Sequence, residues 1–272
     1  MRLFLRKIRR LWLFNFFSRV IYATTYFNKK YLQILKWGFK SKEYTNYTYE
    51  LTEGNIANLA HIVSVVTNED YKKTLGYINE ARNDDKLKSY IIEQTQKSKM
   101  KKFADLRCDF GRRLGWYAFV RIMKPKIVVE TGVDKGLGSV LLCSALLKNK
   151  DDGFTGEYFG TDINPDAGYL LAEEYSSVGK ILYGDSIKSL EKMNNAIDLF
   201  INDSDHSAEY EYQEYKTIKN LLNDKSVILG DNAHCTDMLS KFCTENSLKY
   251  LFFQEIPKNH WYPGAGIGIA YK

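Results

Sequence analysis

From about Lys124 to its end, the chain alternates short apolar runs with longer amphipathic stretches. Strands are expected at 127–130, 156–162, 180–183, 197–202, 226–230, 250–255 and 266–271. Helices are expected between them, up to residue 147 and at 164–178, 187–194 and 209–222. This alternation produces right-handed βαβ units and a mostly parallel sheet. Only a Pro263-Gly264 turn joins the last two strands, which predicts an antiparallel edge. The predicted fold is α/β, a doubly wound, mostly parallel seven-stranded sheet.

The residues before this sheet have a helical pattern. Apolar side chains at Ile56, Leu59, Ala60 and Val63 recur with a period close to 3.6. We therefore expect three regions, which are an N-terminal extension at 1–42, a helical region at 43–123 and the sheet domain at 124–272.

The extension holds all the excess positive charge of the chain. Residues 1–42 contain eleven Lys and Arg and no acidic residue, so the rest holds 39 − 11 = 28 basic against 33 acidic side chains. Within residues 1–27 the basic residues are interleaved with aromatic ones, a pattern typical of a helix that lies on an anionic membrane surface. A helix that packs on its own domain or on a dimer partner fits the pattern equally, so a homo-oligomer stays open. The segment is too charged to predict a membrane-spanning helix.

The composition also bears on partners and compartment. A net acidic body argues against a nucleic-acid partner, because phosphate binding needs concentrated basic residues. The four cysteines show neither a CxxC pair nor a metal-ligand spacing, which favours a reduced protein of the cytoplasm. Contact of residues 1–27 with lipid would place it on the inner face of the membrane.

Polar turns follow the first three expected strands. The first reads Glu130-Thr-Gly132-Val-Asp-Lys-Gly136-Leu-Gly138-Ser139, where glycines allow a ligand to approach the backbone closely. The second ends at Asp162, placed to accept hydrogen bonds from ribose hydroxyls, and the third is followed by Asp185-Ser186, where an acid can meet an adenine amino group. The glycine spacing is not GxGxxG, so a pyrophosphate site is not expected.

Together these turns resemble the S-adenosylmethionine (SAM) binding motifs of class I methyltransferases, over roughly residues 124–272. The resemblance implies a Rossmann-like fold with SAM as cofactor. It places Glu130 and Gly132 near the methionine part, Asp162 near the ribose and Asp185 near the adenine. Gly136, Ser139 and Ser186 are the remaining cofactor-site residues expected from these turns. Gly138 departs from the family pattern, in which a single small polar residue is common.

Acidic residues cluster after the fourth and fifth expected strands. The stretch Asp203-Ser-Asp205-His206 follows one, and Asp231-Asn232 follows the other. Asp203, Asp231 and Asn232 would supply the oxygen ligands that Mg²⁺ prefers, and clustered acids repel one another unless a cation joins them. Asp205, or else His206, could take a proton from a metal-bound hydroxyl. In the alternative interpretation, the aspartates cap helices and His206 is a packing residue.

These two turns resemble metal-dependent O-methyltransferases of the catechol type and of the macrolide and sugar type. The resemblance implies that Asp203, Asp231 and Asn232 bind Mg²⁺ or Mn²⁺ and that Asp205 is the favoured base. The predicted activity is SAM-dependent O-methylation of a hydroxyl on a small molecule, sugar or glycan. Two alternatives are a metal-independent N-methyltransferase and a non-catalytic SAM-binding partner protein docked on a membrane.

Overall fold

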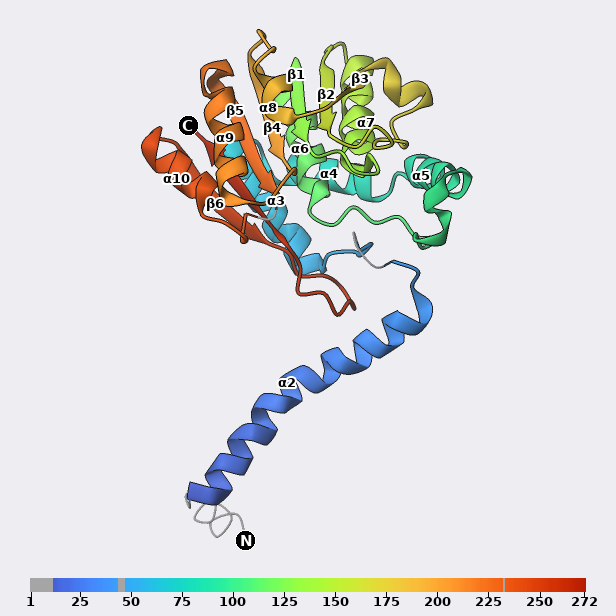
Figure 1. Ribbon diagram of the computed structural model, residues 1–272, viewed down its shortest axis with the longest axis vertical. Helices are drawn as coiled ribbons and strands as arrows, with labels where there is room; N and C mark the ends of the chain where they lie inside the picture. The colour runs from blue at the N-terminus through green and yellow to red at the C-terminus, as the bar shows by residue number, and fades with distance from the viewer. Residues whose placement is uncertain (1–11, 44–46, 232) are drawn as a thin grey trace. The chain divides into compact units, whose positions relative to one another are not determined.

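The computed structural model describes residues 12–43, 47–231 and 233–272 (Figure 1). These residues form two compact units. Residues 12–42 together with Asn259–Tyr262 form the smaller one, and Glu43–Lys258 with Pro263–Lys272 form the larger one. The smaller unit is built on one long helix, α2 (Trp12–Lys40).

The larger unit is built on a single seven-stranded sheet. Its strands, in the order β3-β2-β1-β4-β5-β7-β6, are β1 (Ile127–Thr131), β2 (Glu157–Asp162), β3 (Gly179–Tyr183), β4 (Ile197–Asn202), β5 (Leu222–Asp231), β6 (Lys249–Gln254) and β7 (Gly266–Tyr271). The first five are parallel, and β7 pairs antiparallel with both β5 and β6. The predicted fold class is confirmed, and so is the antiparallel edge.

Helices cover both faces of the sheet. One group is α3 (Glu53–Thr67), α4 (Tyr71–Arg82), α5 (Asp85–Lys97), the short 3₁₀ helix at Lys99–Lys102, α6 (Arg113–Met123) and α7 (Leu137–Asp151). The other is α8 (Ser186–Leu190), α9 (Ala208–Ile218), the 3₁₀ turn at Lys219–Leu221 and α10 (Met238–Glu245). From β1 the chain crosses to β2 on one side, and from β4 it crosses to β5 on the other. Right-handed crossovers in opposite directions place α7 and α9 on opposite faces (Figure 1).

The core on the α9 face is rich in aromatic residues. Phe200 of β4 and Tyr215 of α9 pack edge to face, and Phe242 of α10 packs on Tyr215; all three are buried. This packing fixes the positions of β4 and β5 and, with them, the turns that follow these strands.

Two connections differ from the sequence-based expectation. The helix expected at 164–178 does not form; the chain has only a 3₁₀ turn at Glu173–Ser177. Pro165 disfavours helix at Asn164, and Gly168 takes φ +75°, with its N–H bonded to the carbonyl of Asp134. Conversely, the structure contains a helix, α10, that the sequence did not predict, because its segment is short and lies among polar residues.

Gly138 has a packing role. A Cβ at this position of α7 would lie 2.2 Å from Oε1 of Glu130 and 2.7 Å from Cζ3 of Trp116. We expect Gly138→Ala to lower the free energy of unfolding by about 1–3 kcal/mol, the usual cost of overpacking. Gly76→Ala is the matched control, since Gly76 lies in α4 with open space around it; there we expect a gain of about 0.5–1 kcal/mol. Urea unfolding of both variants measures the two effects, and equal shifts would contradict this account.

Candidate active site

The carboxyl ends of β1, β2 and β4 meet at Gly132. Its N–H donates to the carbonyl of Thr161, and the N–H of Asp203 donates to the carbonyl of Thr131. Gly132 has φ +82°, and a Cβ there would lie only 2.0 Å from the carbonyl oxygen of Asp203. Strand order reverses between β1 and β4, and open α/β sheets bind their ligands at such a switch point.

A first cavity, called here the Asp162 cavity, opens beside Gly132 over the ends of β2, β3 and β4. It is lined by Gly132, Asp134, Thr161, Asp162, Ile163, Asn164, Gly184, Asp185, Ser186, Asp203, Ser204, Asp205 and Tyr210.

Hydrogen bonds hold the acids of the Asp162 cavity in place. Asp162 accepts from the backbone N–H groups of Val133, Asp134 and Asn164. A carboxylate has about four acceptor positions, so Asp162 keeps capacity for one further donor. Asp185 caps α8 by accepting from the N–H of Lys188.

Ser186 and the buried Glu214 of α9 tie the walls of the Asp162 cavity together. Glu214 accepts from the hydroxyls of Ser186 and Ser204, from Thr131 Oγ1 at 3.2 Å and from the side-chain amide of Asn202. Burial raises the pKa of Glu214, and these donors lower it in part. One carboxyl group thereby joins the ends of β1, β4 and α8.

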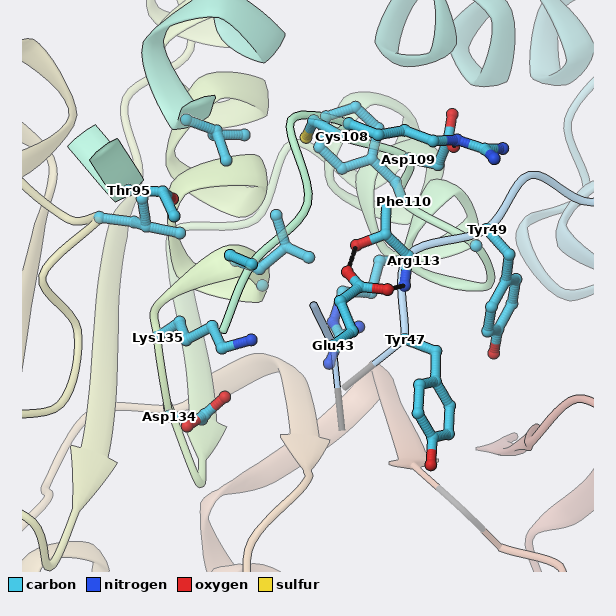
Figure 2. A pocket seen from close by; sticks show the side chains of 18 of the residues that line it. Glu43, Tyr47, Tyr49, Thr95, Cys108, Asp109, Phe110, Arg113, Asp134 and Lys135 are labelled. Carbon is cyan, nitrogen blue, oxygen red and sulfur yellow. Dashed lines mark hydrogen bonds and ion pairs between the residues drawn. The ribbon is translucent and has the colours of Figure 1, made fainter. Parts of the chain in front are cut away.

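A second cavity, called here the Arg112 cavity, also borders Gly132, and Figure 2 shows side chains that line it. It is formed by Glu43 and residues 47–49, by α5, by the loop at 104–112, by the β1 turn and by the turn after β4. Its charged lining residues are Glu43, Asp105, Arg107, Asp109, Arg112, Arg113, Glu130, Asp134, Lys135 and Asp203, with His206 beside them. Gly132, Asp134 and Asp203 line both cavities, so the two meet there.

A buried ion network forms one wall of the Arg112 cavity. Both carboxylate oxygens of Asp231 accept from Arg112, through Nε and Nη2. Arg112 also approaches Glu255, whose Oε1 accepts from the Arg112 backbone N–H at 2.7 Å. Burial opposes ionisation, but the Arg112 guanidinium lowers the pKa of Asp231 to about 2.

Neighbouring groups complete the network. Oε2 of Glu255 accepts from the Tyr49 hydroxyl at 2.8 Å and from the N–H of Ala265 at 2.9 Å. Nη2 of Arg113 lies 3.4 Å from Oδ2 of Asp203. Burial, and next the charge of Asp231, raises the pKa of Asp203 well above its ordinary range. The two guanidinium groups thus face three carboxyl groups, and the raised pKa of Asp203 favours its protonated, neutral form.

The comparisons with known proteins agree with this geometry. Residues 129–233, which run from within β1 to just after β5, match a family described as "Methyltransferase domain". This part of the chain is a methyltransferase domain. No curated protein matches it. Three solved structures share the fold of this methyltransferase at low sequence identity.

An O-methyltransferase from Bacillus cereus in complex with SAH is 14% identical, covers 68% of this chain and 91% of that one, and has a TM-score of 0.53. The O-methyltransferase TomG from Streptomyces achromogenes, involved in tomaymycin synthesis and in complex with SAM, is 13% identical, covers 70% and 90%, and has a TM-score of 0.51. A methyltransferase from Geobacter sulfurreducens is 14% identical, covers 70% and 91%, and has a TM-score of 0.50. The expectation of a class I methyltransferase is confirmed by the family match and the fold.

The expected cofactor residues of the methyltransferase fall into two groups. Gly132, Asp162, Asp185 and Ser186 line the Asp162 cavity, and Glu130 lines the Arg112 cavity. Two others face the protein instead. Gly136 packs against the backbone of Gly168, and the buried Ser139 donates its hydroxyl to Glu130. Gly136 and Ser139 thus contact the side of the β1 turn that faces the protein interior.

The predicted metal ligands do not fit a divalent cation as the structure places them. Asp231 gives both oxygens to Arg112, Asp203 faces Arg113, and Asn232 lies outside the described residues. In the described part of the chain, no three His, Cys, Asp or Glu side chains are grouped to hold a metal. Arg112 and Arg113 supply positive charge beside Asp231 and Asp203, so these two acids have cationic neighbours without a metal ion, and the metal-ligand assignment stays a prediction.

The two base candidates lie on different sides. Asp205 is exposed, lines the Asp162 cavity and accepts from the N–H of Ser207. His206 is half-buried and lines the Arg112 cavity, with Nε2 4.0 Å from Oδ1 of Asp203. His206 and Asp205 therefore line different cavities.

The sequence did not identify four residues of the buried ion network as site residues. They are Arg112, Arg113, Glu255 and Tyr49. Two signals were present, namely the Arg112-Arg113 pair directly after Gly111 and a glutamate, Glu255, that ends an apolar strand. Neither signal shows the partner, because Arg112 and Asp231 are 119 residues apart.

Burial gives Glu130 a measurable pH dependence. It raises the pKa of Glu130 to about 7, although Tyr158 and Ser139 donate hydrogen bonds to it. The folded state therefore holds the Glu130 proton more tightly than the unfolded state. Its contribution to stability is present below pH ~4.5 and is lost as the pH rises towards 7, by on the order of 3 kcal/mol.

Between about pH 5 and about pH 8, the free energy of unfolding of the wild type should fall as Glu130 loses its proton. We expect Glu130→Gln to lack this contribution to the fall, because glutamine does not titrate. Urea unfolding across that range measures it. Glu209→Gln, at an exposed position of α9, is the control and should leave the wild-type slope unchanged. An unchanged slope in Glu130→Gln would contradict the prediction.

Proposed function

We propose that this methyltransferase transfers the methyl group of SAM to a hydroxyl of a small molecule, sugar or glycan. The observation that carries the proposal is the meeting of the Asp162 and Arg112 cavities at Gly132, Asp134 and Asp203. SAM has an adenosyl half that suits the first cavity. Its sulfonium methyl would then lie at the junction and point towards an acceptor in the second.

The donor set of the Asp162 cavity fits SAM. Asp162 has capacity for one ribose hydroxyl, and Asp185 and Ser186 offer oxygens to the adenine edge. Glu130, in the adjoining wall, would meet the methionine amino group. SAH and SAM in the similar O-methyltransferase structures support this cofactor.

We assign His206 as the base that takes the hydroxyl proton, because it lines the acceptor side. As the proton moves to the imidazole, the acceptor oxygen forms a bond to the methyl carbon and the bond from that carbon to sulfur breaks, which leaves SAH. Asp203, 4.0 Å from His206, would orient the ring. Most of the rate enhancement would come from positioning the two reactants in line. Asp205 is the alternative base.

No step in this scheme passes through a metal ion. Mg²⁺ or Mn²⁺ would have to displace Arg112 from Asp231, a bidentate pair of the strong, charge-assisted kind. We therefore propose that transfer persists in the presence of a chelator.

The lining of the Arg112 cavity suggests a polar acceptor. Phe110 and Tyr169 supply ring faces, which suit a sugar or an aromatic ring. Lys135 and Glu43 supply charged hydrogen-bonding groups of both signs around the same space (Figure 2), and Arg107 also lines it. We also propose a cytoplasmic location, which agrees with four free cysteines.

Calorimetric titration with SAH tests the cofactor part. We expect micromolar binding by the wild type and a loss of at least about tenfold in Asp162→Ala, which removes a charge-assisted hydrogen bond. Asp166→Ala, at an exposed position in the following connection, is the matched control. Absence of SAH binding by the folded wild type would refute the proposal.

An acceptor screen with methyl-labelled SAM, run with and without EDTA, tests the chemistry. We expect labelled methyl ethers, equal rates in EDTA, and a fall in kcat of about 10²-fold or more in His206→Ala. The Arg112–Asp231 pair also favours a second candidate, metal-independent N-methylation. Methylated amines in place of ethers would identify that activity.

A further inference from the structure

The helix α2 is largely exposed along its whole length. No residue of its 29 is buried. Along it, apolar side chains recur at intervals of four, three, seven, four and three residues, which is one face of a helix. Those side chains, Leu13, Phe17, Val20, Phe27, Tyr31 and Ile34, are each at least 38% exposed.

The opposite face of α2 is mainly polar and basic. Successive residues of a helix are about 100° apart, so Lys29, Gln33, Lys36 and Lys40 lie across from the apolar row together with the exposed Tyr22, and Arg19 lies at the border of the row. No acidic residue occurs anywhere in residues 1–42, whereas the remainder of the chain has 33 acidic against 28 basic side chains. The charge on α2 is therefore concentrated and of one sign.

Only the last turn of α2 has a described covering. Trp37 packs edge to face against Trp261, with ring centroids 5.3 Å apart, and against His260. Before that turn the apolar row is open over most of its length. None of the described helices is long and apolar enough to span a bilayer.

We propose that α2 lies in the surface of an anionic phospholipid membrane, with the row from Leu13 to Ile34 in the acyl boundary and the lysines among the headgroups. Aromatic side chains next to lysine and arginine suit this interface, and each basic side chain is attracted by anionic lipid. A second copy of α2 would bring the same positive charge and be repelled, so charge complementarity selects lipid.

Vesicle co-sedimentation of the full chain tests this. We expect binding to phosphatidylcholine vesicles that contain phosphatidylglycerol, and at least about tenfold weaker binding to pure phosphatidylcholine. Two variants separate the insertion of the apolar face from the attraction between charges, since each adds one aspartate but on a different face of α2. Phe27→Asp, on the apolar face, should weaken binding at least about tenfold, and Gln33→Asp, on the polar face, only a few-fold.

Thermal unfolding of each variant shows whether the catalytic unit stays folded, and this readout does not depend on the proposed methyl transfer. Equal losses in Phe27→Asp and Gln33→Asp would overturn insertion of the apolar face. Failure of the wild type to bind anionic vesicles would overturn the proposal as a whole. So would a dimer in sedimentation velocity without lipid that Phe27→Asp dissociates, because α2 would then be covered by a second copy.

Discussion

Arg112→Ala is expected to lower the free energy of unfolding by about 3–5 kcal/mol, because it leaves Asp231 and Glu255 as buried carboxylates without their cation. Both carboxylate side chains are fully buried in the structure, so their charges would be left largely without compensation. Urea unfolding at neutral pH measures the loss. Arg107→Ala is the control, since Arg107 pairs with Asp109 at the surface, and it should cost at most about 1 kcal/mol.

The same variant tests whether Arg112 stands where a metal would otherwise bind. Without the guanidinium, Asp203 and Asp231 become free to bind a hard cation. We expect Mg²⁺ to raise the unfolding midpoint of Arg112→Ala and to leave that of the wild type unchanged. An equal rise in the wild type would show that a metal binds beside Arg112, and the metal-independent scheme would be wrong.

Gly132→Ala should lower the free energy of unfolding by more than about 4 kcal/mol. The new Cβ would lie 2.0 Å from the carbonyl oxygen of Asp203, and that oxygen belongs to backbone held by the Asp203–Thr131 hydrogen bond. Relief of the overlap requires β1 and β4 to part where the two cavities meet. Any folded fraction is therefore expected to lose SAH binding.

Gly153→Ala separates steric overlap from backbone strain. Gly153 has φ +89°, close to that of Gly132, but nothing lies within 4 Å of its Cβ position. It should cost only about 1–2 kcal/mol, the penalty of a left-handed conformation. Similar losses in the two variants would mean that φ alone explains the requirement for Gly132.

Much of this architecture is readable from local patterns. The runs at 127–130 and 197–202 are apolar because both faces of a central parallel strand are covered, and they became β1 and β4. The polar turns were also predictable, because acids such as Asp162 and Asp185 lie at or just after the ends of strands that the sequence locates. Neither inference needs knowledge of what a residue contacts.

The failures involve contacts between distant segments. The connection at 164–178 has helix-compatible composition, yet the contact of Gly168 with the carbonyl of Asp134 prevents a helix. The sequence showed the acids after β4 and β5, but it could not show that Arg112 and Arg113, at the start of α6, lie beside them. Long-range pairing has no local signature, so a metal ion was the simplest cation to infer.

The buried ion network has a consequence for the order in which the enzyme is made. Residues up to Tyr210 suffice to line the Asp162 cavity, whereas the Arg112 wall also needs Asp231 and Glu255. Chains begin to fold from the N-terminus while they are synthesised. Glu255, and Ala265, whose N–H donates to it, are among the last of these residues to be synthesised. A chain that stops before β6 would lack Glu255 and with it one carboxylate of the Arg112 wall. The buried ion network is thus completed only when the last two strands have been made.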